Sequence, residues 1–245
     1  MADFGEPIGR VATLTRYPVK SMDGEQLTQA RFGARGLDGD RNWAVYTEDG
    51  GIGSGKTSRR FRRVNGLLGL QARMDDDAAG GVPTIRFPDG AEHRADDPAA
   101  GAALSSLLGR PLRLAEESLV PHHDDCPVHL ITTAAVRHLG KLIGEPIDGV
   151  TRFRANLVLE IDGTGFVEDD WSNRKLRLGE EVVLALGPGM PRCVMVGMPR
   201  PLDGLPTDGR LLKKLGQVHQ TDFGLQAEVI RGGTVRPGDQ ATLLS

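Results

Sequence analysis

The sequence predicts a mainly β (α+β) protein built from two β-barrel-like domains that carry short helices. Thirty-three glycines and fifteen prolines divide the 245 residues into short segments, which favours strands joined by turns over long helices. The segments between the turns are rich in Val, Thr, Leu and aromatic residues, as strands are. They form two groups separated by a polar stretch near residues 115–122, and we therefore predict domains at 1–118 and 119–245.

The first domain begins with three predicted strands, in "GRVATLTRYPV", "QLTQARFGA" and "RNWAVYTE", separated by turns at residues 22–25 and 36–39. This spacing predicts a meander or a small barrel. For "RRFRRVNGLLGL" a short helix with a basic face and a strand both remain open, and the acid-rich "MDDDAAGGVP" predicts a solvated loop. A strand in "TIRF", a turn at residues 88–90 and a helix near "AAGAALSSLLG" complete the domain.

The second domain begins with "VHLITTAAVRHLGKLIG", in which Thr132 or Thr133 can cap a helix with apolar residues at helical spacing. Strands are predicted in "ANLVLEI", "KLRLG", "EVVLALG", "RCVMVG", "GLQAEVI" and "DQATLL", and a helix in "GRLLKKLGQV". A run of strands with Gly-Pro and Pro-Gly turns predicts a second β-barrel decorated by helices.

The composition excludes several classes of protein. Thirty basic and 33 acidic residues, without a basic block, argue against a nucleic-acid partner. No apolar stretch is long enough to span a bilayer, and "MADFGEPIGR" lacks the features of a secretory signal, so we expect a cytoplasmic protein with no membrane partner. Two cysteines exclude a disulfide framework, a four-thiolate zinc site and a protein-held iron-sulfur cluster.

A glycine-rich run matches the nucleotide-binding pattern G-x-x-x-x-G-K-[ST] at Gly50, Gly55, Lys56 and Thr57. A working P-loop connects a buried parallel strand to a helix within an alternating β-α-β sheet. The preceding segment, "NWAVYTEDG", instead alternates polar and apolar residues, which is typical of an antiparallel strand with one wet face. We therefore expect a glycine-rich hairpin or Ω-loop and little effect from the loss of Lys56.

Two other stretches predict an anion site. Lys20 and Ser21, in "YPVKSMDGE", present a cation and a hydroxyl between a strand and a turn, where backbone amides are free. Arg41 begins the next strand, and the predicted helix start at Thr132 and Thr133 adds further amides. Each residue alone is also explained as a surface charge or an ordinary cap, but together they suit a phosphate.

A third stretch, "TRFRANLVL", places Arg152, Arg154 and Asn156 on one face if the segment is extended. Two guanidinium groups and an amide in a row can hold a phosphate or the polar edge of a heterocycle. Solvated strand polarity explains the same pattern equally well.

The two cysteines lie in different contexts. Cys193 follows Arg192 in "GPGMPRCVMVG", at the predicted start of an apolar strand, and a cationic neighbour favours the reactive thiolate. A lone intracellular cysteine is also common as buried filler. Cys126 lies in "HHDDCPVH", whose spacing fits no standard zinc pattern, so we predict a linker between the domains there.

Taken together, the ordered motifs resemble the MOSC superfamily, named for the molybdenum cofactor sulfurase C-terminal domain, in the arrangement with an N-terminal MOSC-type β-barrel domain. The resemblance runs from about residue 8 to residue 243. The motifs that carry it are "YPVKS", "GLDGDRNWAV", "VHLITTAAV", "RFRANLVL", "FVEDDW", "LRLGE", "RCV" and "FGLQAEVIRGGTVRPGD".

The resemblance implies a β-barrel protein that binds the molybdenum cofactor (molybdopterin), with the metal held by the cofactor's dithiolene and by one protein cysteine. By matching position, Cys193 is the implied metal ligand and catalytic residue. The implied cofactor-binding residues are Lys20, Ser21, Arg41, Thr132, Thr133, Arg152, Arg154, Asn156 and Arg192.

Some members of this superfamily reduce N-hydroxylated compounds with electrons from a partner protein or an attached iron-sulfur domain, so this chain would need a separate electron-donor protein. The reductases resemble R-C-x-x-T-T-V-D-P, whereas here residues 196–199 read "VGMP". Pro191 also replaces a residue that often carries a hydroxyl group. Both departures place the reductase substrate site in question.

Three functions follow as hypotheses. The first is a molybdenum-dependent oxidoreductase that reduces N-hydroxylated or related small-molecule substrates, with Cys193 as the metal ligand. The second is a sulfur or cofactor carrier in which Cys193 holds a persulfide. The third is a metal-free MOSC scaffold that catalyses another reaction in specialised metabolism.

Overall fold

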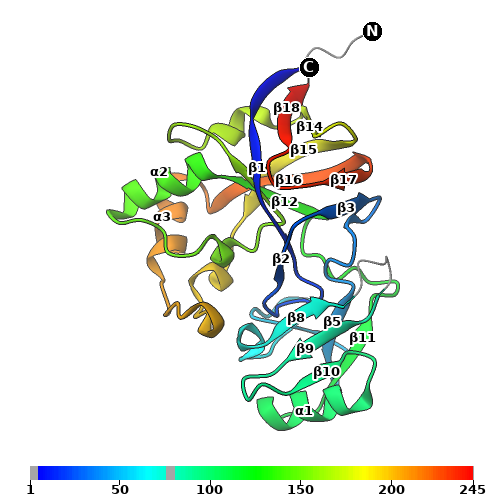
Figure 1. The fold of residues 1–245 in the computed structure, drawn as a ribbon. Helices are drawn as coiled ribbons and strands as arrows, with labels where there is room; N and C mark the ends of the chain where they lie inside the picture. The colour runs from blue at the N-terminus through cyan, green and yellow to red at the C-terminus, as the bar shows by residue number, and fades with distance from the viewer. Residues whose placement is uncertain (1–4, 76–80, 245) are drawn as a thin grey trace.

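A computed structural model describes residues 5–75 and 81–244 and has the mainly β architecture that the sequence predicts. Figure 1 shows a barrel in the upper part and a smaller group of sheets in the lower part. The predicted loop "MDDDAAGGVP" falls partly outside the described residues.

The upper part is a closed barrel of seven strands in the order β13-β12-β16-β15-β14-β18-β1, which the pairing of β1 with β13 closes, and β2 extends from β1. Its strands are β1 (Glu6–Arg16), β2 (Glu25–Leu27), β12 (Val128–Thr132), β13 (Leu157–Glu160), β14 (Lys175–Leu178), β15 (Val182–Pro191), β16 (Asp222–Arg231) and β18 (Gln240–Leu244). The barrel is filled by alternating apolar side chains, among them Leu14, Leu130, Leu157, Leu184 and Leu225, as expected for a small barrel.

The first strand completes a barrel whose other six strands all follow residue 127. In β1, Val11 pairs with Leu159 on one side, and Glu6 pairs with Leu243 on the other. Dividing the chain between residues 118 and 119 would therefore separate this barrel from one of its strands, β1. The domain boundary itself stays a prediction.

The lower part contains two small sheets, β8-β9-β10 and β7-β6-β5-β11, around one apolar core. Its elements are β5 (Trp43–Thr47), β6 (Ile52–Ser54), β7 (Phe61–Arg63), β8 (Gln71–Met74), β9 (Pro83–Arg86), β10 (Glu92–Arg94), β11 (Leu112–Glu116) and α1 (Pro98–Leu108). A third sheet, of β3 (Ala30–Gly33), β4 (Gly36–Leu37) and β17 (Gly233–Val235), pairs the N-terminal part of the chain with its end.

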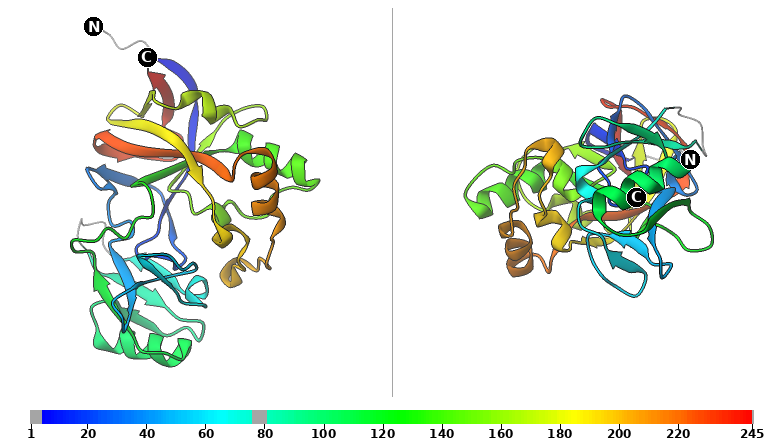
Figure 2. Two further views of the ribbon diagram at one scale, coloured as in Figure 1. Left: turned by 180° about the vertical axis from the view of Figure 1, so that it is seen from behind. Right: turned by 90° about the horizontal axis from the view of Figure 1, so that it is seen from below.

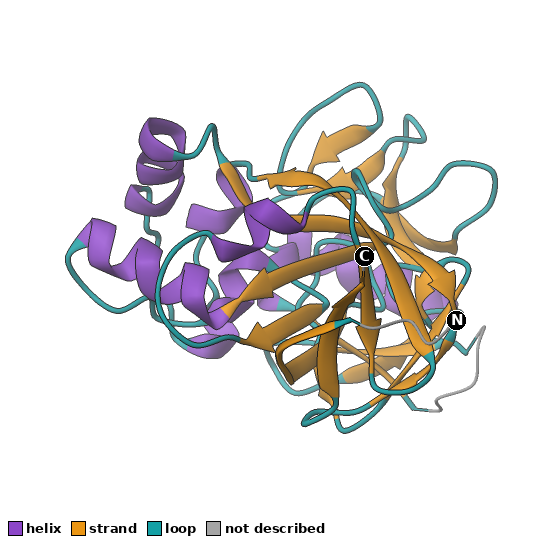
Figure 3. Ribbon diagram, turned by 90° about the horizontal axis from the view of Figure 1, so that it is seen from above, coloured by secondary structure: helices purple, strands orange, loops and turns teal. Residues whose placement is uncertain are grey.

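The three predicted helices are present. Besides α1, they are α2 (Thr133–Ile143), capped by the Thr132 side chain, and α3 (Arg210–Val218). Both pack on one side of the barrel, as Figure 2 shows from behind and Figure 3 from above. Their apolar faces cover a second core, where the rings of Phe153 and Phe223 stack with centroids 4.0 Å apart. None of the helices in the described ranges is both long and apolar enough to cross a bilayer.

Two local predictions differ from the structure, and a third segment, for which a helix and a strand were both open, contains a strand. "RCVMVG" is a 3-10 helix, Val194–Gly197, and no strand, because β15 already ends at Pro191. The extended segment expected at residues 152–156 is also a 3-10 helix, Val150–Phe153, followed by Arg154 in the left-handed conformation. "RRFRRVNGLLGL" resolves into strand β7 and a single 3-10 turn, Leu67–Gly69.

Candidate functional site

The glycine loop lacks P-loop architecture. Strand β6 lies inside the motif and pairs antiparallel with β5, and the next element is the strand β7 where a P-loop needs a helix. Lys56 nevertheless lines a cavity, although the sequence predicts only a glycine-rich turn around it.

This cavity, of about 60 Å³, lies where the lower sheets meet the barrel, and we call it the basic cavity. It unites seven residues of the predicted site: Lys20, Ser21, Arg41, Arg154, Asn156, Arg192 and Cys193. It also takes in residues from the two stretches interpreted as a loop and a linker: Lys56, His123, Asp124, Asp125, Cys126 and His129. Met190, Pro191 and Met195 complete the wall.

Unusual backbone conformations gather at the basic cavity. Six non-glycine residues of the described chain have positive φ, and three of them line it, namely Ser21 (65°), Arg41 (52°) and Arg154 (53°). Such conformations cost free energy for residues with a Cβ and persist where surrounding contacts impose them. The backbone N–H of Lys20 donates to the Trp43 carbonyl at 2.8 Å, which fixes the first of these segments against β5.

Two lysines share one carboxylate. Lys20 Nζ lies 2.8 Å from Asp124 Oδ1, and Lys56 Nζ lies 3.4 Å from Asp124 Oδ2. Burial lowers the pKa of Lys20 to about 8 although Asp124 opposes the shift. Burial would raise the pKa of Asp124, but the two lysines outweigh it and hold that pKa well below its usual range. Asp124 thus lies where two cations converge on one anion.

Arg41 is oriented by buried partners. Its guanidinium contacts the carboxylate of Asp40, which is fully buried and also accepts from the Tyr17 N–H at 2.8 Å. Arg41 Nη2 donates to the Arg154 carbonyl at 3.3 Å, and its Nη1 lies 3.5 Å from Asn156 Oδ1. Asn156 also donates to the Thr15 carbonyl at 3.3 Å, so this amide joins β1 to the site.

Two other arginines keep unused donors. Nη1 and Nη2 of Arg154 are buried and make no hydrogen bond within the described ranges, and the guanidinium lies 4.2 Å from the Tyr17 ring centroid. Burial and the nearby Arg200 lower the pKa of Arg154 to about 9. Arg192 donates from Nη2 to the Phe153 carbonyl at 2.7 Å, but its buried Nε has no partner there either. Buried donors without acceptors are costly, so both groups are suited to an anion.

The two cysteines differ in their surroundings. Cys193 is half-buried and lines the basic cavity beside Arg192, so it is not core filler. Cys126 lies just before β12. Its Sγ is 3.0 Å from the Val128 carbonyl, and burial raises its pKa to about 11. Cys126 is therefore a protonated thiol at neutral pH. In the described ranges no group of three or more His, Cys, Asp or Glu side chains is arranged to hold a metal ion.

Three residues of the predicted site lie away from the basic cavity. Thr132 Oγ1 caps α2 and donates to the buried Glu168 carboxylate at 2.7 Å. Thr133 Oγ1 donates to the Ile161 carbonyl at 3.1 Å. Arg152 donates to the carbonyls of Met198 and Pro206 at 3.1 and 2.8 Å, which holds the loop after Cys193. Their polar atoms are used within the protein: Thr132 and Thr133 hold the start of α2, and Arg152 lies in a 3-10 helix and not in the extended segment that the sequence predicts.

Glu168 makes stability depend on pH. It is fully buried, and burial raises its pKa from 4.5 to about 7. The folded state binds the Glu168 proton more tightly than the unfolded state does. The stability that Glu168 contributes is therefore fully present below about pH 4.5 and is lost as the pH rises through about 7. In the wild-type protein the free energy of unfolding should therefore fall by about 3 kcal/mol at most over this range. We expect this fall to be absent in Glu168→Gln. Urea unfolding at several pH values measures this effect. If the free energy of unfolding depends on pH in the same way in the wild-type protein and in Glu168→Gln, the prediction is wrong.

The two lysines should contribute unequally to anion binding. Lys20 is 4% exposed, whereas the side chain of Lys56 is 25% exposed. We expect Lys56→Ala to weaken the binding of inorganic phosphate about two- to fivefold and Lys20→Ala to weaken it about tenfold or more. Calorimetric titration measures both, with ATP as a second ligand. A preference for ATP that Lys56→Ala abolishes would restore the nucleotide-binding interpretation.

Comparison with known proteins agrees with this architecture. The MOSC domain matches residues 117–242, and the MOSC N-terminal beta barrel domain matches residues 8–96. The chain is 26% identical over 249 aligned positions to the molybdenum cofactor sulfurase of Danio rerio, covering 81% of this chain but only 30% of that protein. The crystal structure of the YuaD protein from Bacillus subtilis is similar in fold, with a TM-score of 0.55 at 12% identity and 99% coverage of both chains. The chain therefore belongs to the MOSC domain family, with the N-terminal β-barrel domain that accompanies it.

Proposed function

We propose that the basic cavity binds one end of the molybdenum cofactor and that Cys193 is the protein ligand of its metal. The observation that carries the proposal is the excess of unused positive charge around a thiol. Five cationic side chains line the cavity against two carboxylates, and two of the arginines keep buried donors for which the described part of the chain offers no acceptor. A phosphate-bearing ligand supplies the missing acceptors.

The size of the cavity limits what it can enclose. About 60 Å³ is room for about four water molecules. Only one end of the cofactor would be enclosed, and the rest would lie over the mouth, where Lys56 and Asp124 are partly exposed. Because Asp124 already neutralises both lysines, binding an anion there requires its carboxylate to move aside.

The proposed reaction is the reduction of an N-hydroxylated compound. Two electrons and two protons convert R–NHOH to R–NH2 and water, and the electrons come from a separate donor protein. When bound, the cofactor supplies the oxidation-reduction chemistry. Within the chain, Cys193 offers a soft sulfur ligand, and Arg41, Arg154 and Lys20 orient the anionic part of the cofactor. Arg152 positions the loop that follows Cys193 through its two carbonyl contacts.

The test is cofactor content. We expect protein purified from a host that makes the cofactor to contain molybdenum by mass spectrometry and pterin by the fluorescence of its oxidised form, in near-equal amounts. Lys20→Ala should lower both. If molybdenum and pterin are absent from the wild-type protein, the metal-free scaffold becomes the better account.

A sulfur carrier is the second candidate, favoured by the placement of Cys193. Its half-buried sulfur shares a cavity with Arg192, and cations stabilise a persulfide anion as they do a thiolate. The relative from Danio rerio is named a molybdenum cofactor sulfurase, although the chain spans about a third of its length. Cyanide-releasable sulfur on Cys193 in metal-free protein would favour this function. Its absence, together with bound molybdenum, would favour the reductase.

A further inference from the structure

An apolar cavity of about 600 Å³ adjoins the basic cavity. Ser21 lines both of them. At their junction, a Cβ added to Gly55 would lie 3.0 Å from Met195, which borders the basic cavity, and 3.0 Å from Met198, which borders the apolar one. Met195 and Met198 therefore come close to the same point beside Gly55, where the two cavities adjoin.

The lining of the second cavity is suited to a hydrocarbon. Leu67, Leu68 and Pro201 contribute to its wall, and Leu202 on its rim leaves 49% of its surface exposed. Covering such a surface with a ligand is favourable in proportion to the apolar area removed from water. Gly69 forms part of the wall without filling it, since the nearest atom to an added Cβ is Pro201 Cγ at 3.9 Å.

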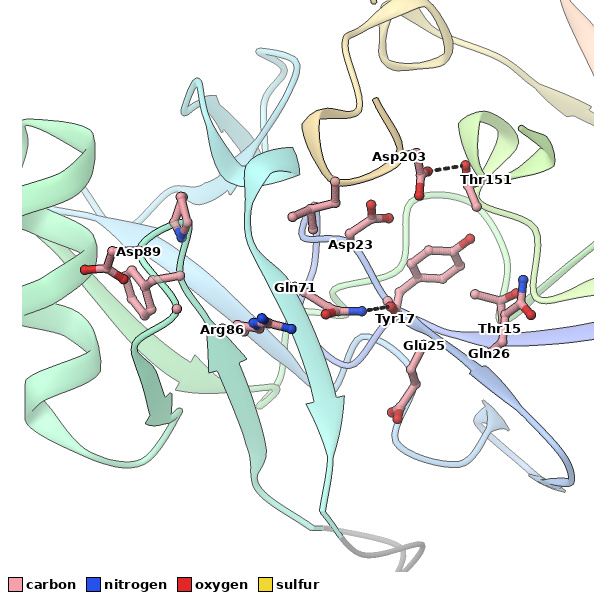
Figure 4. Close-up of a pocket in the computed structure, with 15 residues that line it drawn as sticks. Thr15, Tyr17, Asp23, Glu25, Gln26, Gln71, Arg86, Asp89, Thr151 and Asp203 are labelled. Atoms are coloured by element: carbon pink, nitrogen blue, oxygen red, sulfur yellow. Dashed lines mark hydrogen bonds between the residues drawn. The ribbon is translucent and has the colours of Figure 1, made fainter. Parts of the chain in front are cut away.

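A third cavity, of about 780 Å³, continues from the apolar one, because Pro88 and Leu202 line both. Figure 4 shows its labelled side chains, with Tyr17 and Asp23 on the segment after β1, Asp203 and Thr151 above them, and Arg86 and Asp89 on the side of β9.

Its charge is predominantly negative. Four carboxylates line it, those of Asp23, Glu25, Asp89 and Asp203, against the single cation Arg86. We call it the acidic cavity.

Two buried polar groups line the acidic cavity. Asp23 is 7% exposed and lies near the guanidinium groups of Arg154 and Arg200, with Arg200 Nη1 at 3.7 Å from its Oδ1. Tyr17 is 2% exposed, and the guanidinium groups of Arg41 and Arg154 lie 5.0 and 4.2 Å from its ring centroid. Glu25 and Asp203 are already engaged by Arg16 and Thr151. The carboxylate of Asp23 and the hydroxyl of Tyr17, both lining this roomy cavity, offer acceptors to a donor-rich ligand.

We propose that the three cavities form one substrate groove and that the substrate class is an organic cation with an apolar body. The cationic end would lie among the carboxylates of the acidic cavity, the body against Leu67, Leu68 and Leu202, and the reacting group toward Cys193. The order of the cavities, acidic, then apolar, then thiol-bearing, carries the inference. The identification of the occupant as a substrate rests on the proposed function, whereas the preference for an apolar cation does not.

The test uses cofactor-free protein and three probes with one apolar body: phenylbutylamine, phenylbutanol and phenylbutanoate. Calorimetric titration should give the tightest binding for the amine, about tenfold tighter than for the carboxylate. Gly69→Leu, which places a side chain in the apolar cavity, should weaken all three about tenfold or more. The matched control is Gly209→Leu, at an exposed position with no atom near the added Cβ, and should change nothing.

Charge is tested separately by the double variant Asp23→Asn and Asp89→Asn, which keeps the shapes of the side chains. It should weaken the amine and leave the alcohol unchanged. Equal binding of amine and carboxylate, or insensitivity to Gly69→Leu, would overturn the proposal. Because no metal takes part in these titrations, their failure is distinguishable from a failure to find molybdenum.

Discussion

Cys193→Ser is expected to lower the reduction of N-hydroxylated compounds by about a hundredfold or more, with the fold and the pterin content retained. Serine keeps the size of the side chain but replaces a soft sulfur donor with a hydroxyl group, which is a poor ligand for a thiolate-preferring metal. Residue 193 is half-buried at the start of a 3-10 helix, and its side chain makes no capping hydrogen bond to that helix, so the substitution should cost little stability. Turnover with reduced methyl viologen as donor measures the effect.

The matched control is Val194→Ser, which introduces the same side chain at the next residue. Val194 is 48% exposed and is not among the residues of the basic cavity, so turnover and cofactor content should both stay near wild type. Unchanged turnover in Cys193→Ser, or an equal loss in the two variants, would show that the sulfur at position 193 is not needed for the reaction.

Arg154→Met is expected to stabilise the cofactor-free protein while removing most of its ability to retain the cofactor. Arg154 is 6% exposed, with two nitrogen atoms that find no acceptor among residues 5–75 and 81–244 and a pKa that burial lowers to about 9. Methionine keeps the contact with Tyr17 but carries no buried charge. The gain should be about 1–3 kcal/mol in the free energy of unfolding. Urea unfolding and molybdenum content measure the two effects.

Arg152→Met is the matched control and should have the opposite effect on stability. Arg152 is also buried, but its guanidinium donates to the carbonyls of Met198 and Pro206, which its loss would leave unsatisfied. We expect a destabilisation of about 1–3 kcal/mol. If both variants destabilise the cofactor-free protein to the same extent, Arg154 stabilises the fold and is not an unpaired donor that serves to bind an anion.

Much of the fold follows from patterns that are local in the chain. Thr132 precedes an apolar helical repeat, and the structure places it as the cap of α2. Turn clusters rich in Gly and Pro separate short apolar segments, and these become the strands of a mainly β fold. By contrast, no local pattern shows that Glu6–Arg16 closes a barrel with strands more than a hundred residues later, because that pairing depends on the whole topology.

The candidate site was predictable only in part, for a related reason. The arginines at 152 and 154 were expected on one strand face, but a 3-10 helix turns one toward the loop after Cys193 and the other into the basic cavity. Lys56 and Asp124 were missed because each lies in a stretch with a plausible local explanation, a glycine turn and a linker. Only the folded structure shows that these two residues, which lie 68 positions apart in the chain, form an ion pair at the cavity.

The most direct test of the central claim is X-ray absorption at the molybdenum edge, applied to cofactor-loaded wild-type protein and to Cys193→Ser. We expect one sulfur neighbour fewer around molybdenum in the variant, with a lighter atom in its place. The same number of sulfur neighbours in both proteins would contradict the assignment of Cys193 as the ligand.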